Sequence, residues 1–488
     1  MSRWVKIAAL TVALAGAAFA AVLFALWSSA AESNVGELEF ANELAIPPLA
    51  EPELDSEGRM AFALELQRGT SELLPGTTTE TWGANGPQLA PTLRASRGDL
   101  VAPEVTNGLG SETTTLHWHG MRLPAEADGG PHQAIAPGET WTPQWEVDQP
   151  AATLWYHPHP HGETEEHVYR GLVGMFILDD PESRRLALPD DYGIDDIPVI
   201  IQDRKLDDDG SLDFSKGPIS PTGLLGDEIF VNGTHDPHVE VTRERVRLRL
   251  LNASGARFYD VGLADGRSFE LVATDGGLLS SPVTMERILL SPAERAEIVV
   301  DLDPGEEVVL RSFEPDLATN VFEGRFAGAD DSFDLLELRA AAELDPAPPV
   351  PARLASVGEP DASAASQTRS FTLSGQGAID GRSMDIDRID QVVPPGATEI
   401  WEVENGSGTP HSFHPHDVRF RILEIAGGPP PPHLDGLKDT VFIPPGESAR
   451  LLIEFGDQTS EHPYMYHCHL LQHEDRGMMG QFRVSPIG

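Results

Sequence analysis

The segment YHCHLLQHEDRGM, residues 466–478, decides the fold and the chemistry of this chain. It contains Cys468, the single cysteine among 488 residues, directly between His467 and His469. Successive side chains on a strand point to opposite faces, so the two histidines point one way and the cysteine the other. Cys468 can therefore bind one metal while its neighbours bind another, and the backbone between them forms a short electron path.

Histidines elsewhere in the chain repeat this pattern. Ten of the 17 histidines fall in four short clusters, which chance does not produce. A His-X-His spacing on a strand puts both imidazoles on one face, where they can converge on metal ions. The four clusters are His117 and His119; His157 and His159; His411, His414 and His416; and His467, His469 and His473.

The ligand types indicate which metal is bound. One thiolate, two imidazoles and a weak thioether are the ligands of a blue-copper electron-transfer site, and Cys468, His411, His473 and Met478 supply this set. Zinc also accepts one cysteine and two histidines, but it has no redox use for a neighbouring cluster of eight histidines. A lone cysteine is usually a small buried hydrophobe. The flanking histidines favour copper instead.

Composition excludes several classes of protein. Asp and Glu number 78 against 34 Lys and Arg, and the formal charge of −44 repels nucleic-acid phosphates and anionic membrane surfaces. We therefore expect no nucleic-acid partner. One cysteine permits neither an intramolecular disulfide nor a four-cysteine zinc site. An apolar share of 40% excludes wholesale disorder, and 488 residues predict about three domains.

Beyond about residue 45, the sequence predicts short strands separated by turn-forming residues. Residues 246–250 and 400–403 alternate with period two, and Asn232-Gly233 is a hairpin dipeptide. With 41 Pro and 46 Gly, the sequence predicts an all-β sandwich or barrel architecture.

An internal repeat divides the chain. Pro137-Gly138-Glu139 leads to His157 and Pro445-Gly446-Glu447 leads to His467, over intervals of 20 and 22 residues. The middle region has a similar strand frame but only His235 and His238, so we expect a metal-free spacer there. The predicted domains are 45–189, 197–342 and 369–488, with a Pro/Ala-rich linker over 343–368.

Residues 1–31 predict a signal peptide or a membrane anchor. Arg3 and Lys6 precede 21 uncharged residues, Ile7 to Trp27, which as a helix measure roughly 31 Å. Small residues at 28–31 allow cleavage, and a buried core helix is the weakest interpretation because no amphipathic stripe interrupts the run. Basic residues before this run and acidic residues after it place the body outside the cytoplasm, where it would be periplasmic, on the cell surface or secreted. Membrane contact is expected only through this segment, if it is uncleaved.

At these motifs the sequence resembles the multicopper oxidases, a three-domain, cupredoxin-type family that includes laccases, bilirubin oxidases, spore-coat laccases and bacterial copper-efflux oxidases. The resemblance covers essentially everything after the leader, and it implies three Greek-key cupredoxin-like domains and four copper ions. By position it implies a type 1 copper at His411, Cys468, His473 and Met478; a type 2 copper at His117 and His414; and a type 3 pair at His119, His157, His159, His416, His467 and His469.

The resemblance also implies a mechanism. A small reductant gives up electrons one at a time at the type 1 copper, Cys468 passes them on, and dioxygen is reduced to water by four electrons. Oxygen reduction consumes protons, which carboxylates can donate. Asp128 and Glu474 match the family's proton-relay positions, although either acid alone also fits a solvated loop charge.

The substrate class follows from what the chain lacks. The cuprous-oxidase members carry a methionine-rich insertion, whereas this chain has nine methionines and no cluster in that region. Residues 405–410 offer no soft Cu(I) ligand before His411. We therefore expect a laccase-like oxidase of phenols, aromatic amines or similar donors, with cuprous-ion oxidation second. A copper-binding electron carrier would need only the type 1 set, and a structural envelope protein on this fold would be expected to lack ligands.

Overall fold

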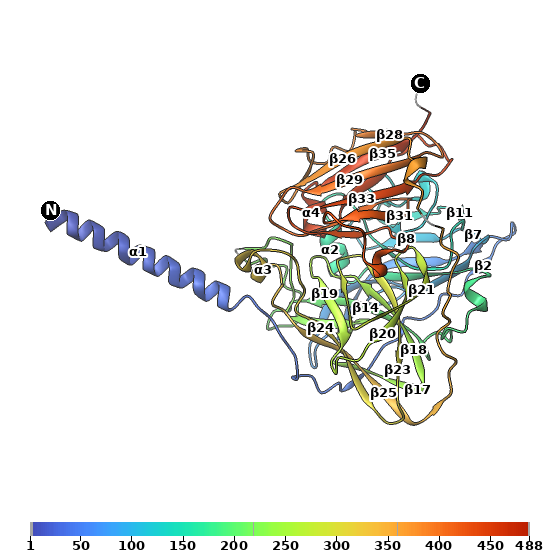
Figure 1. Ribbon diagram of the computed structural model, residues 1–488, viewed down its shortest axis with the longest axis horizontal. Coiled ribbons are helices and arrows are strands. Elements are labelled where there is room, and N and C mark those ends of the chain that lie inside the picture. Colours follow the sequence, from blue (N-terminus) through green and yellow to red (C-terminus); the bar gives the residue numbers. More distant parts are fainter. Residues whose placement is uncertain (1–2, 218, 359, 487–488) are drawn as a thin grey trace.

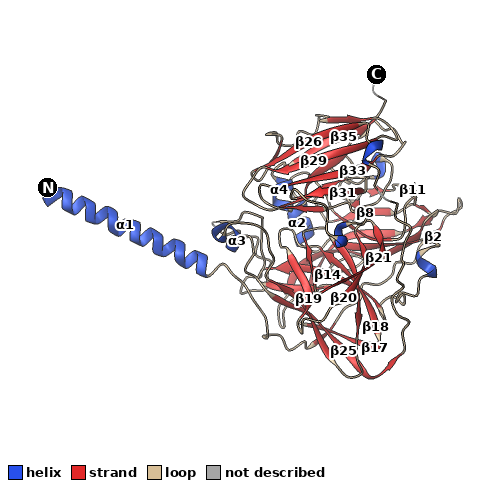
Figure 2. Ribbon diagram, in the orientation of Figure 1, coloured by secondary structure: helices blue, strands red, loops and turns tan. Residues whose placement is uncertain are grey.

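The computed structural model describes residues 3–217, 219–358 and 360–486, and its body is built of strands joined by loops, with few helices (Figure 2). Among the described residues, seven sheets fall into three groups that follow one another along the chain, except that β1 near the N-terminus joins a sheet of the middle group. The all-β prediction is confirmed. One long helix, α1 (Arg3–Ser28), projects away from the body (Figure 1).

The first sheet group contains three four-stranded sheets. In the sheet β6-β13-β12-β9 the two first-half histidine motifs are neighbours, because β9 pairs with β12 and sets His117 opposite His157. The strands are β2 (Glu53–Leu54), β3 (Met60–Ala61), β4 (Ala63–Ser71), β5 (Thr79–Ala84), β6 (Leu93–Ser96), β7 (Leu100–Val101), β8 (Glu104–Gly108), β9 (His117–His119), β10 (Thr140–Trp141), β11 (Trp145–Glu146), β12 (Ala152–His157) and β13 (Gly174–Asp179).

The middle group consists of a seven-stranded and a six-stranded sheet that share one large apolar core. Asn232-Gly233 forms the predicted hairpin: both residues have positive φ (51° and 74°), and Val231 lies opposite Thr234. The strands are β1 (Asn42–Glu43), β14 (Asp196–Arg204), β15 (Glu228–Val231), β16 (Thr234–His235), β17 (Pro237–Arg243), β18 (Arg245–Asn252), β19 (Tyr259–Leu263), β20 (Phe269–Thr274), β21 (Gly277–Met285), β22 (Arg287–Leu290), β23 (Arg295–Asp301), β24 (Glu307–Phe313) and β25 (Phe333–Asp345).

The third group has two five-stranded sheets. Strand β30 pairs with β34 and sets His414 opposite His467, so the second-half histidines are neighbours as well. The strands are β26 (Gln367–Ser374), β27 (Ala378–Ile379), β28 (Gln391–Val393), β29 (Thr398–Asn405), β30 (His411–Pro415), β31 (Phe420–Ile425), β32 (Val441–Ile443), β33 (Ser448–Glu454), β34 (Tyr464–Cys468) and β35 (Met479–Val484). The exact domain and linker bounds stay predictions; β25 runs to Asp345, slightly beyond the expected end of the middle domain.

Short helices fasten the first and third groups together. Helix α2 (Thr164–Tyr169) follows the histidines of β12, and α4 (Leu471–Asp475) follows those of β34. The Asp475 carboxylate accepts hydrogen bonds from the backbone N–H groups of Thr164 (2.9 Å) and Glu165 (3.0 Å), so α4 caps α2. The other helix is α3 (Val321–Phe326), and single 3₁₀ turns lie at Ala125–Ala127, Ser183–Arg185, Ala362–Ala364 and Pro432–Leu434.

Helix α1 is apolar on all sides and packs against the body only near its end. The span Leu10–Ser28 has a mean hydropathy of 2.2, and within the described part of the chain none of its apolar window is buried. A core helix would be buried. The exposed apolar helix is therefore consistent with a signal or an anchor.

Candidate metal centre

Three of the predicted ligands form one compact group, called the three-residue site below: His411, Cys468 and His473. His411 Nδ1 lies 3.3 Å from Cys468 Sγ, His473 Nδ1 lies 3.6 Å from the same sulfur, and the two Nδ1 atoms are 3.1 Å apart. Strand β30 begins at His411, β34 ends at Cys468, and α4 presents His473. One ion at the centre of this triangle is within reach of all three ligand atoms.

The Nε2 atoms of His411 and His473, on the ring side away from Cys468, contact loop residues. His473 Nε2 donates to the carbonyl of Pro221 (2.8 Å), and His411 Nε2 lies 2.9 Å from Ser407 Oγ. Because a carbonyl only accepts, the proton of His473 is on Nε2, and Nδ1 keeps its lone pair for a metal. Met478 is fully buried in the same core as Cys468, and its carbonyl accepts from the Cys468 N–H (3.1 Å).

Burial shapes the thiol of this site. It raises the pKa of Cys468 to about 12, because a thiolate without a cation is costly in an apolar core. Burial also lowers the pKa of His473 to about 4, so its imidazole is neutral. The site is built for a thiolate stabilised by a bound cation.

The remaining eight histidines form a second group, the histidine cluster, between the first and third sheet groups. Each is at most 1% exposed. Five lie on strands β9, β12, β30 and β34, namely His117, His119, His157, His414 and His467, and three lie just beyond the ends of β12, β30 and β34, namely His159, His416 and His469.

Backbone carbonyls orient the rings of this cluster. Nδ1 of His117, His157 and His414 donates to the carbonyls of Asp128, Pro158 and Asp439 at 2.9, 2.8 and 2.7 Å. The opposite Nε2 atoms of these three rings are buried and have no hydrogen-bond partner among the described residues. Buried polar atoms are rarely left unpaired, so these converging lone pairs fit a site for a bound cation.

Other rings of the cluster also bring their Nε2 atoms close together. His467 Nε2 lies 3.3 Å from His159 Nε2 and 3.2 Å from His416 Nε2. Burial, with neighbouring imidazoles, lowers the pKa of His119, His157, His414, His416 and His469 well below the usual value. Neutral imidazoles with converging lone pairs fit copper, one of the metals that imidazole ligands suit.

Both predicted acids touch cluster histidines. Asp128 Oδ2 accepts from His416 Nδ1 (2.8 Å), while Glu474 contacts Nδ1 of His159 (3.3 Å) and of His467 (3.2 Å). Each acid is 1% exposed, so neither is a solvated loop charge. The pKa of Glu474 is lowered because the two histidines outweigh the cost of burial.

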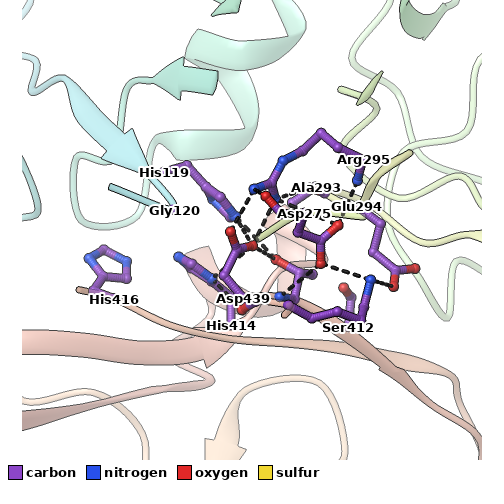
Figure 3. A network of polar contacts seen from close by, with 12 residues as sticks. His119, Gly120, Asp275, Ala293, Glu294, Arg295, Ser412, His414, His416 and Asp439 are labelled. Atoms are coloured by element: carbon purple, nitrogen blue, oxygen red, sulfur yellow. Dashed lines mark hydrogen bonds and ion pairs between the residues drawn. The ribbon is translucent and has the colours of Figure 1, made fainter. Parts of the chain in front are cut away.

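Sequence reasoning missed a buried ionic network that joins the middle sheet group to the cluster (Figure 3). Arg295, at the start of β23, donates to both oxygens of Asp439 at 2.7 and 2.5 Å. Asp439 Oδ1 in turn accepts from His119 Nε2 (3.1 Å). Lys438 extends the network to Asp275 (2.8 Å) and Glu294 (3.0 Å). The middle group thus braces a cluster histidine.

This network gives the middle group a contact with the cluster beyond the expected metal-free spacer. The middle group supplies no histidine to either site among the described residues, yet its Arg295 and the Pro221 carbonyl contact groups in or beside both sites. Asp439 escaped prediction because it lies 25 residues after His414 with no metal-ligand spacing. The one weak signal is a charged pair, Lys438-Asp439, just before an apolar strand.

Gly120, which directly follows His119, lies against the same ion pair. Its φ is +82°, and a side chain there would collide with the Asp439 carboxylate and the Arg295 guanidinium. Glycine is required because backbone and ion pair approach this closely.

Comparison with known proteins agrees with this geometry. Two family models, both described as multicopper oxidase, match residues 65–183 and 345–488. The multicopper oxidase mco of Staphylococcus aureus is 34% identical over 456 residues, covering 93% of this chain and 94% of that protein. The chain belongs to the multicopper oxidase family. It is therefore a member of a family of copper-binding oxidoreductases with cupredoxin-like domains.

Other similar members of the family differ in their described roles. The cell division protein FtsP of Xenorhabdus nematophila is 39% identical over 454 residues, covering 91% of this chain and 93% of that protein. The solved structure of a laccase-like multi-copper oxidase, CueO, from Ochrobactrum sp. has a TM-score of 0.82 at 36% identity and covers 91% of this chain and 100% of that one. That protein is described as having oxidase activity towards lignin model compounds.

Proposed function

We propose that this multicopper oxidase is a laccase-like enzyme outside the cytoplasm. It removes single electrons from phenols, aromatic amines or similar small donors at the three-residue site, and dioxygen is reduced to water at the histidine cluster. Four electrons and four protons are consumed for each dioxygen, which gives two waters.

Copper, when bound, supplies the redox chemistry of both sites. His411, Cys468 and His473, together with Met478, would hold a type 1 ion. His117 and His414 would hold a type 2 ion, and a type 3 pair would be held by His119, His157, His159, His416, His467 and His469. Cys468 is bonded through the backbone to both His467 and His469, which supports a direct electron path between the sites.

The observation that carries the proposal is the completeness of the donor set. The full complement of ten histidines and one cysteine is buried, and the cluster rings are oriented with unpaired nitrogens toward one another. An electron carrier needs only the three-residue site. A structural protein on this fold would be expected to lack ligands, so a complete donor set for both sites favours catalysis.

Asp128 and Glu474 are proposed to carry protons. Each is held against Nδ1 of a histidine that belongs to the cluster: Asp128 against His416 and Glu474 against His467. A side chain on Gly129 would collide with the Leu116 carbonyl, so the turn that carries Asp128 is tightly fixed. A carboxylate in such a fixed position can accept a proton and pass it on to the reacting oxygen without reorganisation.

Phenolic donors are favoured over cuprous ion. The loop before His411 supplies hydroxyls from Ser407 and Thr409 but no sulfur, whereas Cu(I) prefers soft ligands. The relative from Ochrobactrum sp. also has oxidase activity towards lignin model compounds.

The test is oxygen uptake by the copper-loaded full chain with 2,6-dimethoxyphenol and, separately, with Cu(I). We expect an intense blue absorption and faster turnover with the phenol. Cys468→Ser should abolish both colour and uptake, while His462→Gln, at an exposed histidine outside the motifs, should change neither. Colour without uptake would favour a carrier, no colour a structural protein, and faster turnover with Cu(I) the cuprous oxidase.

A further inference from the structure

The end of helix α1 is fastened to the body by helix α3. Arg325 of α3 donates to the Trp27 carbonyl (3.0 Å), and its guanidinium lies 4.8 Å from the centre of the Trp27 ring. The chain after α1 continues this attachment, since the Glu32 N–H donates to Asp331 (2.9 Å). Helix α1 therefore leaves the body at a defined place.

That place is beside the three-residue site. The opposite end of α3 reaches the loop before His411: a Cβ on Gly408 would lie 2.9 Å from Glu323 Oε2. The next residue toward the N-terminus, Ser407, contacts His411. The six-residue helix α3 thus lies between the C-terminal end of α1, called its base below, and the loop that contacts His411 of the three-residue site.

A cavity of about 280 Å³ lies between the two features. Leu26, Ser29 and Ala30 at the end of α1 form one wall, and Ser220 and Gly223 form another. Pro221, between these last two, accepts the hydrogen bond from His473 Nε2. The remaining lining is mixed: Ile219, Leu224, Leu225 and Phe326 are apolar, while Glu32, Lys205, Lys216 and Asp227 are charged. The cavity therefore connects the base of α1 to the loop that covers His473.

The surface around the base of α1 is apolar. Val321 and Phe322 of α3 are 76% and 44% exposed, which is unusual for large hydrophobic side chains so close together. Figure 1 shows α2, α3 and α4 on the side of the body from which α1 projects. If α1 crosses a bilayer, this side of the body faces the lipid surface.

We propose that α1 is retained as an anchor, and that the side of the body that carries α2, α3 and α4 rests on the membrane. The three-residue site then oxidises a hydroquinone dissolved in the lipid. This inference rests on the proposed oxidase function and names its substrate class. The ring would enter the cavity from the bilayer while the hydrocarbon tail stays in the lipid beside Val321 and Phe322. Each hydroquinone loses two electrons and two protons to become a quinone, so two hydroquinones reduce one dioxygen to two waters.

The experiment uses the copper-loaded full chain in phosphatidylcholine vesicles that contain ubiquinol-10, with oxygen uptake as the readout. Water-soluble methylhydroquinone is the parallel donor. Mass spectrometry of the membrane-extracted chain reports whether residues 1–31 are present. We expect them to be present, and both donors to be oxidised.

The deciding variant is Val321→Ser with Phe322→Ser. It should slow ubiquinol-10 oxidation by about tenfold, because apolar area that would be buried in lipid is lost, while methylhydroquinone oxidation changes less than about twofold. Leu54→Ser is the matched control, since Leu54 is 72% exposed on β2, away from α1 (Figure 1). Arg325→Gln, which detaches α1, should reproduce the loss if the double variant is unstable.

Three results would overturn the inference: a mature chain without residues 1–31, oxidation of methylhydroquinone alone, or equal effects of the double variant and Leu54→Ser. A blue protein that oxidises neither donor would instead reject the proposed function, and this inference with it.

Discussion

The three-residue site and the histidine cluster lie next to each other but are assembled in different ways. All ligands of the first come from residues 411–473, within one sheet group, whereas the cluster takes half of its histidines from residues 117–159 and half from 414–469. The first site is thus a local product of one fold. The second exists only when two sheet groups dock, with a third bracing them.

The largest expected effect separates the two sites by removing one cluster ligand. His414→Ala should reduce oxygen uptake to background, because two candidate ligand groups lose a member. The blue absorption should remain, since His411, Cys468 and His473 are untouched. Absorption spectra and oxygen electrode traces on one sample check both. Loss of colour together with uptake would show that the sites are not separable.

A second variant tests the brace from the middle sheet group. Arg295→Met leaves Asp439 buried without its partner, which should cost about 3–5 kcal/mol in the free energy of unfolding. Copper bound by the cluster should fall while the blue site stays filled. Chemical denaturation, copper content and the type 2 paramagnetic resonance signal measure these effects.

The control for this variant keeps the charge. Arg295→Lys cannot form the two-pronged contact with Asp439, so it should recover part of the stability but not the full cluster occupancy. Unchanged copper content in Arg295→Met would contradict a bracing role.

A third variant concerns protons. Glu474→Gln should slow oxygen reduction by about 100-fold, since a positioned acid contributes at least this factor. The rate at which substrate reduces the blue site should stay the same. It is measured without oxygen, as the loss of the blue absorption. Glu461→Gln, with a side chain 97% exposed, is the control. Equal slowing of both steps would assign Glu474 a structural role instead.

The smallest effect is expected at the edge of the three-residue site. Ser407→Ala removes the contact with His411 Nε2, worth about 1 kcal/mol, and should shift the blue absorption slightly. Ser407→Thr keeps the hydroxyl and should restore the spectrum. A change in the type 2 signal, which reports on the cluster, would be inconsistent with two independently built sites.

Local pattern was enough to predict much of this molecule. His117 and His119 lie on β9, which pairs with β12 and sets His117 opposite His157, and Asn232-Gly233 forms its hairpin, because period-two alternation and turn chemistry act over a few residues. In the other three motifs the second histidine lies just beyond the end of its strand. Helix α1 was equally evident from 21 uncharged residues.

The rest depended on contacts between distant residues. Arg295 and Asp439 are 144 positions apart, and nothing in the sequence around either one indicates the other. The attachment of α1 beside His411 likewise depends on Arg325 and Glu323, which resemble ordinary surface charges in the sequence. Tertiary docking, rather than any motif, determines these parts.

The division of the histidine cluster between the two halves of the chain has a consequence for folding. Metal bound there ties residues 117–159 to residues 414–469, so it acts as a clasp that is absent from the unfolded chain. By mass action, free copper at about 100 times its dissociation constant adds about 2.7 kcal/mol to the folded state. Resistance to heat should therefore rise with metal loading, and in a cell the supply of copper would govern how long each molecule survives as well as how fast it works.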